Sequence, residues 1–339
     1  MRSKEIKSFI RKACEDPSNT PPAYIWGQPG IGKSSVIREV AEELKIGFID
    51  TRPAQHDASD YRGIPAVVDG EARWLASSEL PFKSNKRVRE KGLLIADELS
   101  SAPPLIQATL YQPFLDRKLG EEEIRDGWYM IAAGNRIEDR AVVYRMSTAL
   151  ANRFIHIDYE VNIDDWTKWA LDSNIDSNVI AFIKWKPELL APKFDPNSSE
   201  KAFATPRTWE FASTIVEMHL GVMTHELLEG TIGKGAAAEF MAFLKIQTRL
   251  PDLDDILIRN KNIVPKEVDL KYALVAALAT RAKGPQQYER LLQYSEELPE
   301  EFNVLMVKLM IAKDEQSLML CPSRNEWAKK HADVLIARS

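Results

Sequence analysis

The chain has 339 residues, of which 45% are apolar and 28% are charged, and its formal net charge is −5. These values are typical of a globular protein long enough for two domains. The acidic balance disfavours broad, non-specific binding to nucleic acid. No apolar run reaches the length of a membrane span, and no apolar stretch resembling a signal peptide occurs near Met1. We therefore expect a cytoplasmic protein that makes no membrane contact.

The two cysteines, Cys14 and Cys321, are far apart in the sequence and belong to no Cys/His cluster. The sequence therefore predicts neither a disulfide framework nor a zinc site. One segment, just before a predicted buried strand, is rich in basic side chains. It is either a local nucleic-acid contact or a solvated connector, and the connector is favoured. Its basic residues are Lys83, Lys86, Arg87, Arg89 and Lys91.

Over the first half of the chain, short apolar runs alternate with helical patterns. This alternation is typical of a parallel sheet covered by helices on both faces. The predicted strands cover residues 24–27, 47–51, 92–97, 128–134 and 153–158. The predicted helices between them cover residues 34–44, 104–115 and 142–151. Five strands with crossover helices predict one doubly wound α/β domain.

After about residue 160 the strand signals stop and helical patterns follow one another. The predicted helices cover residues 164–171, 179–185, 206–220, 236–249 and 268–282. Segment 192–206, which contains three prolines, is predicted to be an irregular loop within this helical half. A boundary between an α/β part and a helical part is therefore expected near residue 160.

The first predicted strand leads directly into a phosphate-binding loop. Residues 27–34 read Gly-Gln-Pro-Gly-Ile-Gly-Lys-Ser, which matches G-x-x-x-x-G-K-[ST] in full, and a helical pattern follows. Glycines let backbone N–H groups approach phosphate oxygens, Lys33 can reach the β and γ phosphates, and the Ser34 hydroxyl can hold Mg²⁺. The alternative, a glycine-rich turn that only joins strand to helix, is disfavoured by these flanks. The expected nucleotide-binding residues are Gly27, Gln28, Pro29, Gly30, Ile31, Gly32, Lys33, Ser34 and Ser35.

The third predicted strand ends in two acids, Asp97 and Glu98. An aspartate at the carboxyl end of a buried strand can hold the water shell of Mg²⁺, and the adjacent glutamate can polarise an attacking water. The alternative is a strand end capped by two solvated acids. Following a phosphate-binding loop, the pair predicts ATP hydrolysis, with Ser34 and Asp97 at the metal and Glu98 as a catalytic residue.

Three further polar residues are candidates for the same site. The fourth predicted strand runs into Asn135, whose amide can reach between the γ-phosphate and the water, although an asparagine in a turn is common. Arg153 precedes the fifth strand and can neutralise transition-state charge on the γ-phosphate from a neighbouring subunit. Arg140 and Arg145 compete for this role, and a surface salt bridge is the alternative for each. In the helical half, Arg207 follows a proline that suits a first helical turn, from which it can reach back over the nucleotide.

Together these residues resemble the AAA+ ATPases over about residues 1–220. The matching positions are Walker A at 27–34, Walker B at 93–98, sensor 1 at Asn135, an arginine finger at Arg153 and sensor 2 at Arg207. Within that superfamily the chain looks like the MoxR branch, which belongs to the helix-2-insert group. The supporting segments are 57–63, the Leu-Ala-Asn-Arg-Phe segment at 150–154, and Thr-Pro-Arg at 205–207.

The resemblance implies a P-loop AAA+ core with a five-stranded parallel sheet at residues 1–159. A helical lid at 160–247 and a helical C-terminal extension at 248–339 follow. The segment after sensor 1 lacks the Asn-Pro common in MoxR relatives, which leaves the roles of Arg136 and Arg140 open.

ATP and Mg²⁺ are the cofactors that the resemblance implies. It also implies a ring, expected to be a hexamer, that remodels a protein partner of the kind carrying a von Willebrand factor A domain. The insert at 64–82 contains a predicted hairpin turn at Asp69-Gly70, and Tyr61 and Trp74 are candidates for partner contact. The alternative for Trp74 is packing onto the core. A nucleic-acid-directed AAA+ protein, such as a helicase loader or a replication or restriction factor, and a slow nucleotide-gated switch are the alternative functions.

Overall fold

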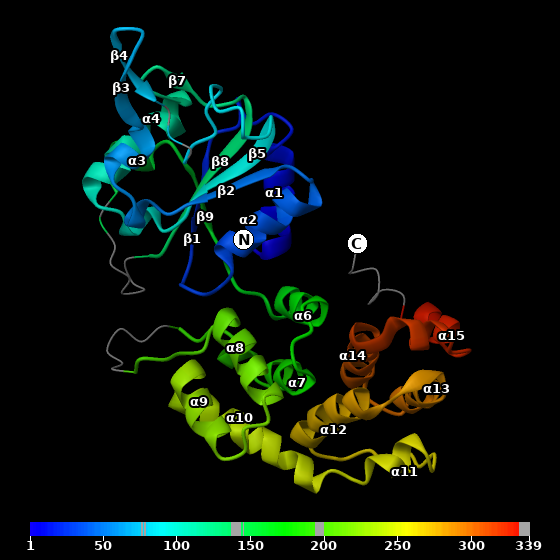
Figure 1. Ribbon diagram of the computed structural model, residues 1–339. Helices are drawn as coiled ribbons and strands as arrows, with labels where there is room; N and C mark the ends of the chain where they lie inside the picture. Colours follow the sequence, from blue (N-terminus) through cyan, green and yellow to red (C-terminus); the bar gives the residue numbers. More distant parts are fainter. Residues whose placement is uncertain (76, 78, 137–143, 145, 194–199, 332–339) are drawn as a thin grey trace. The chain divides into compact units, whose positions relative to one another are not determined.

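The computed structural model describes residues 1–75, 77, 79–136, 144, 146–193 and 200–331, which form two compact units (Figure 1). The first unit comprises Met1–Asn162 together with Lys193. The second comprises Ile163–Pro192 and the described residues from 200 onward. The change from strands to helices expected near residue 160 therefore coincides with a change of unit.

A five-stranded parallel sheet forms the centre of the first unit, in the order β2-β5-β8-β1-β9. The order places β1 between β8 and β9, with Ile25 opposite both Ala133 and Ile157. Because all strands are parallel, their carboxyl ends lie at one edge of the sheet. The strands are β1 (Ala23–Trp26), β2 (Gly47–Thr51), β5 (Lys91–Ala96), β8 (Gly127–Gly134) and β9 (Ile155–Asp158).

Helices cover both faces of this sheet, which explains why its strands are nearly continuous apolar runs. In β5, Leu93 and Ile95 face α1 (Ser3–Ala13) and α2 (Lys33–Glu43). Leu94 and Ala96 face the other side, where α3 (Ala58–Arg62) and α4 (Pro104–Asp116) pack (Figure 1). The two faces thus form two separate hydrophobic clusters, and successive side chains of one strand contribute to each in turn.

The hairpin predicted around Asp69-Gly70 is confirmed. Strand β3 (Ile64–Val68) pairs with β4 (Glu71–Leu75) in an antiparallel ladder that closes at Val68 and Glu71. Asp69 and Gly70 have φ angles of 53° and 83°, as a two-residue type I′ turn requires. Figure 1 shows the hairpin extending away from the central sheet. A second, short hairpin joins β6 (Lys118–Leu119) to β7 (Glu122–Glu123).

One predicted helix is much shorter than expected. Instead of covering 142–151, helix α5 is limited to Thr148–Ala151, while Tyr144 and Met146 are not helical; residues 142, 143 and 145 lie outside the described residues. The helix begins where it does because the Ser147 side chain accepts a hydrogen bond from the Leu150 N–H, which is an N-cap contact. The strand expected from residue 153 also begins later, at Ile155.

In its described part, the second unit contains helices and no strand. Phe182, Trp209, Phe240 and Phe243 form an aromatic core in its first half, with ring centroids 5.0 to 5.5 Å apart. Its α-helices are α6 (Ile163–Asp172), α7 (Ser177–Trp185), α8 (Pro206–Glu217), α9 (Met223–Ile232), α10 (Lys234–Ile246), α11 (Leu253–Leu257), α12 (Val268–Arg281), α13 (Gly284–Ser295), α14 (Glu300–Met319) and α15 (Arg324–Lys330).

Helix α12 packs against both α7 and α14, so helices from before and after residue 247 share one compact unit. The division of this unit into a lid and an extension stays a prediction. The helix expected over 206–220 ends at Glu217, because His219 and Gly221 have positive φ angles that a helix does not allow. Among the described helices, none has the length and apolar character needed to cross a membrane.

Candidate active site

The phosphate-binding loop lies between the carboxyl end of β1 and the start of α2. Gly30 and Gly32 have φ angles of 77° and 93°, and a Cβ atom at Gly32 would meet no atom within 4 Å. Its backbone conformation, and not crowding, therefore favours glycine there. No side chain caps the N-terminus of α2. Uncapped N–H groups beside open space are a suitable binding site for phosphate.

Lys33 holds the two ends of this loop and the neighbouring strand together. Its Nζ donates hydrogen bonds to Gly27 O (2.7 Å), Gln28 O (2.9 Å) and Asn135 Oδ1 (2.8 Å). The residue is only 8% exposed, and burying an ammonium group requires such acceptors. All three of these acceptors are neutral oxygens.

Ser34 and Asp97 lie side by side at the same edge. The Ser34 Oγ donates to Asp97 Oδ2 at 2.5 Å, while Asp97 Oδ1 accepts the N–H of Glu98 at 3.0 Å. The Asp97 N–H in turn donates to Thr51 O at 2.8 Å, so the end of β2 fixes the turn that follows β5. A hydroxyl and a carboxylate in contact are oxygen ligands that suit Mg²⁺, and these residues therefore fit the metal.

Glu98 is exposed directly after Asp97, in a backbone conformation that few non-glycine residues adopt. Its φ and ψ angles are 56° and 30°, in the left-handed region, and the 3₁₀ turn η2 (Leu99–Ser101) follows. Backbone strain of this kind concentrates at functional sites, where the surrounding structure maintains it. Glu98 thus follows Asp97 directly in the chain and is exposed, without being part of the core.

Asn135, which follows β8, is placed by a residue that the sequence analysis missed. The Ser100 Oγ accepts the Asn135 N–H (3.2 Å) and lies 3.3 Å from Asn135 O, to which its hydroxyl donates. Ser100 is fully buried two residues after Glu98, so this pair joins the turn after β5 to the turn after β8. No motif marks such a contact, because it forms between neighbouring strands and not along the chain.

One partly buried and one fully buried group shape the electrostatics near the site. Burial, with a further contribution from the charge of Asp97, raises the pKa of Asp50 in β2. Arg38 donates to Asp50 Oδ2 at 3.2 Å, which opposes that rise. Burial also raises the pKa of Tyr24, so its hydroxyl beside Gly134 stays neutral at physiological pH.

Gly134 provides a test of this packing. A Cβ atom there would lie 2.1 Å from the Tyr24 hydroxyl and 2.5 Å from Ser100 Oγ. Gly134→Ala should therefore lower the free energy of unfolding by about 1–3 kcal/mol, the usual effect of overpacking, and displace Asn135. Chemical denaturation measures this change.

Gly230 in α9 is the matched control, because a Cβ atom there would meet no atom within 4 Å. Gly230→Ala should stabilise the protein by about 0.5–1 kcal/mol, since alanine favours a helix interior. Equal stability of Gly134→Ala and the unchanged protein would contradict this account of the site's packing.

Arg153 does not join its own phosphate loop. It precedes β9 at the end of the sheet where Ile155 pairs with Ala23, whereas Gly27 lies beyond the other end of β1. Four residues of strand at about 3.3 Å each place the two ends on the order of 10 Å apart. Arg140 and Arg145, the competing arginines, lie outside the described residues.

The structure also places Arg136 and Arg207, one in each unit. Arg136 Nη2 donates to Asp158 Oδ1 at 2.8 Å, which is a salt bridge at the end of β9. Arg207 belongs to the second unit, where it is exposed in the first turn of α8, just after the N-cap residue Thr205. Its role at the nucleotide stays a prediction.

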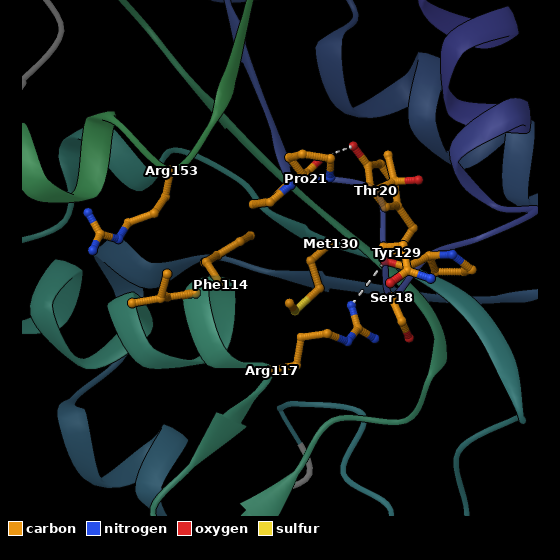
Figure 2. Close-up of a pocket in the computed structure, with 12 residues that line it drawn as sticks. Ser18, Thr20, Pro21, Phe114, Arg117, Tyr129, Met130 and Arg153 are labelled. Atoms are coloured by element: carbon orange, nitrogen blue, oxygen red, sulfur yellow. Dashed lines mark hydrogen bonds between the residues drawn. The ribbon is translucent and has the colours of Figure 1, made fainter.

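A cavity of about 250 Å³ lies at the amino end of the sheet, away from the phosphate loop (Figure 2). Arg117 lines it and donates from Nη2 to Arg125 O and Trp128 O, at 2.8 Å each, which stabilises the chain around β8. Figure 2 shows Arg153 on another side of the cavity, with its guanidinium group well separated from that of Arg117. The two arginines therefore do not form a joint anion site.

The predicted contact residues of the insert have opposite outcomes. Tyr61 is fully buried, and its hydroxyl lies 2.8 Å from Thr51 Oγ1, so its expected role as a partner contact is wrong. Trp74 is 58% exposed, which excludes packing onto the core.

In the basic segment, Lys83 Nζ pairs with Glu123 (2.9 Å) and Asp126 (3.4 Å), as the connector interpretation expects.

The first unit is thus an α/β domain with a five-stranded parallel sheet and a G-x-x-x-x-G-K-[ST] loop between β1 and α2, and a helical unit follows, as the sequence predicted. No protein-family model and no curated protein matches the chain.

Among solved structures, the chain is similar to RuvB from Thermotoga maritima, described as a Holliday junction branch migration motor. Identity is 15%, the TM-score is 0.41, and the match covers 81% of this chain and 80% of that one. A point mutant of the same RuvB gives 17% identity and a TM-score of 0.42, with the same coverage. A putative ATPase from Cytophaga hutchinsonii gives 12% identity and a TM-score of 0.34, covering 96% of this chain and 87% of that one.

Proposed function

We propose that this protein is an ATP-hydrolysing AAA+ ATPase of the MoxR-like branch that forms a ring and remodels a protein partner. One observation carries the proposal. Lys33, Ser34, Asp97, Glu98 and Asn135 gather at the carboxyl edge of the sheet, through direct contacts or adjacency in the chain. This set combines phosphate binding, metal ligation and a base, which are the parts that ATP hydrolysis requires.

Each residue has a separate role in the proposed reaction. The loop N–H groups and Lys33 bind the phosphates of ATP, and Glu98 accepts a proton from the attacking water. A bond forms between the water oxygen and the γ-phosphorus while the bond to the β,γ-bridging oxygen breaks, giving ADP and phosphate. Ser34 and Asp97 would hold Mg²⁺, which supplies charge neutralisation on the phosphates. Asn135 orients the water.

The position of Arg153 supports assembly into a ring. Arg153 lies at the amino end of the sheet, opposite its own phosphate loop, so its guanidinium group is available to the nucleotide of a neighbouring copy. A head-to-tail interface of this kind closes into a ring when the rotation between copies permits. We propose a hexamer, with Arg207 contributing from the helical lid.

The hairpin β3–β4 is the proposed contact for the protein partner. Val67 and Trp74 are 78% and 58% exposed, and Ile64 and Leu75 at its base are 69% and 54% exposed. Exposed apolar side chains gathered on one element are typical of protein-binding surfaces. The proposed partner is of the kind that carries a von Willebrand factor A domain.

Phosphate release measured against protein concentration tests the proposal. Turnover per subunit should rise with concentration and reach a plateau as rings form, because each complete site requires two copies. Activity per subunit that is constant down to the monomeric state would contradict a site shared between copies.

A further inference from the structure

The side chain of Arg153 is held by helix α4 of its own subunit. Its Cζ lies 4.8 Å from the centroid of the Tyr111 ring, and its Nη1 donates to Ala149 O at 2.7 Å. A planar guanidinium group is attracted to the face of an aromatic ring. Tyr111 therefore fixes the direction in which the guanidinium group points.

The next residue is anchored on the same helix. Phe154 is buried, and its ring centroid lies 5.0 Å from that of Phe114. Tyr111 and Phe114 are three residues apart on α4, so both project from one face of the helix. This face thus contacts the Phe154 ring through Phe114 and the Arg153 guanidinium group through Tyr111.

The same arrangement leaves Arg153 with unused donors. Among the residues that the structure describes, Nη1 donates to Ala149 O and Nη2 has no acceptor, whereas Nε is buried and therefore out of reach of a ligand. A guanidinium group stacked on a ring still presents its edge to an anion, and paired N–H donors suit phosphate oxygens. The ring therefore orients Arg153 without occupying the donors that a phosphate requires.

We propose that Tyr111 is a positioning residue for ATP hydrolysis in the neighbouring copy. Its ring holds the guanidinium plane of Arg153 so that the free edge meets the γ-phosphate bound by the next subunit. This inference rests on the proposed function, because it needs Arg153 to act across the interface. The Tyr111 hydroxyl has no part in the proposal.

Steady-state ATPase kinetics of Tyr111→Leu and Tyr111→Phe, each at concentrations where rings form, test the proposal. Tyr111→Leu should lower kcat by about three- to thirtyfold, the range expected for loss of one cation–π contact, and leave the KM for ATP unchanged. Tyr111→Phe should keep kcat close to that of the unchanged protein, because the ring is retained. Thermal melting of both variants checks that α4 still packs.

A double variant separates positioning from general damage. In an Arg153→Ala background, adding Tyr111→Leu should lower kcat no further, since the ring then has no guanidinium group to hold. Full activity of Tyr111→Leu, an equal loss in Tyr111→Phe, or a further loss in the double variant would overturn the inference. If Arg153→Ala alone keeps full kcat, the shared site itself fails, and with it the role of Tyr111.

Discussion

Glu98→Gln should stop ATP hydrolysis while leaving nucleotide binding intact. Glu98 is exposed after β5, and its carboxylate does not contribute to the hydrophobic core, so the change should not alter folding. Glutamine has nearly the same size but cannot accept a proton from water. Loss of a general base typically lowers the rate by about 10² to 10⁴. Phosphate release measures kcat, and titration with a fluorescent ATP analogue measures the Kd.

Lys33→Ala is the contrasting variant. Lys33 contacts the loop carbonyls and is proposed to bind the phosphates, so its removal should raise the Kd for ATP. Glu98→Gln should leave this Kd unchanged. Hydrolysis by Glu98→Gln at the unchanged rate would show that another group activates the water.

Arg153→Ala should lower kcat by about 10³ to 10⁵ in assembled rings, the effect of losing an arginine that neutralises transition-state charge. Nucleotide affinity should stay the same, because the proposed contact of Arg153 acts on charge that develops in the transition state and not on the bound ground state. The measurements are kcat and Kd at concentrations that give full assembly, with ring formation followed by analytical ultracentrifugation.

Arg87→Ala is a suitable control for this variant, since Arg87 is an exposed arginine of the same unit in the basic connector. It should retain full turnover. Equal activity of Arg153→Ala and Arg87→Ala in intact rings would remove Arg153 from the catalytic site.

The central sheet could be predicted because its strands are buried on both faces and therefore appear as apolar runs between helical patterns. The placement of the loop between β1 and α2 could be predicted because the motif and its flanks are adjacent in the chain, while its phosphate binding stays a prediction. The helix expected at 142–151 failed for a local reason. The N-cap contact of Ser147 sets the start of α5 at Thr148, whereas periodicity alone suggested a start at residue 142.

Contacts between distant segments could not be predicted in the same way. Ser100, after β5, contacts Asn135 at the end of the neighbouring strand β8, and Tyr111 in helix α4 contacts Arg153, which precedes β9. Neither pair has a spacing that a motif records. The same limit explains Tyr61, where an aromatic residue beside an exposed hairpin is itself buried against Thr51.

Subunit mixing tests the shared site most directly. Glu98→Gln subunits keep Arg153, and Arg153→Ala subunits keep Glu98, so neither variant alone should hydrolyse ATP at an appreciable rate. In a randomly mixed ring with equal amounts of each, about a quarter of the interfaces would combine an intact base with an intact arginine. The mixture should therefore hydrolyse ATP faster than either variant alone. A mixture no faster than the average of the two would contradict catalysis between neighbouring copies.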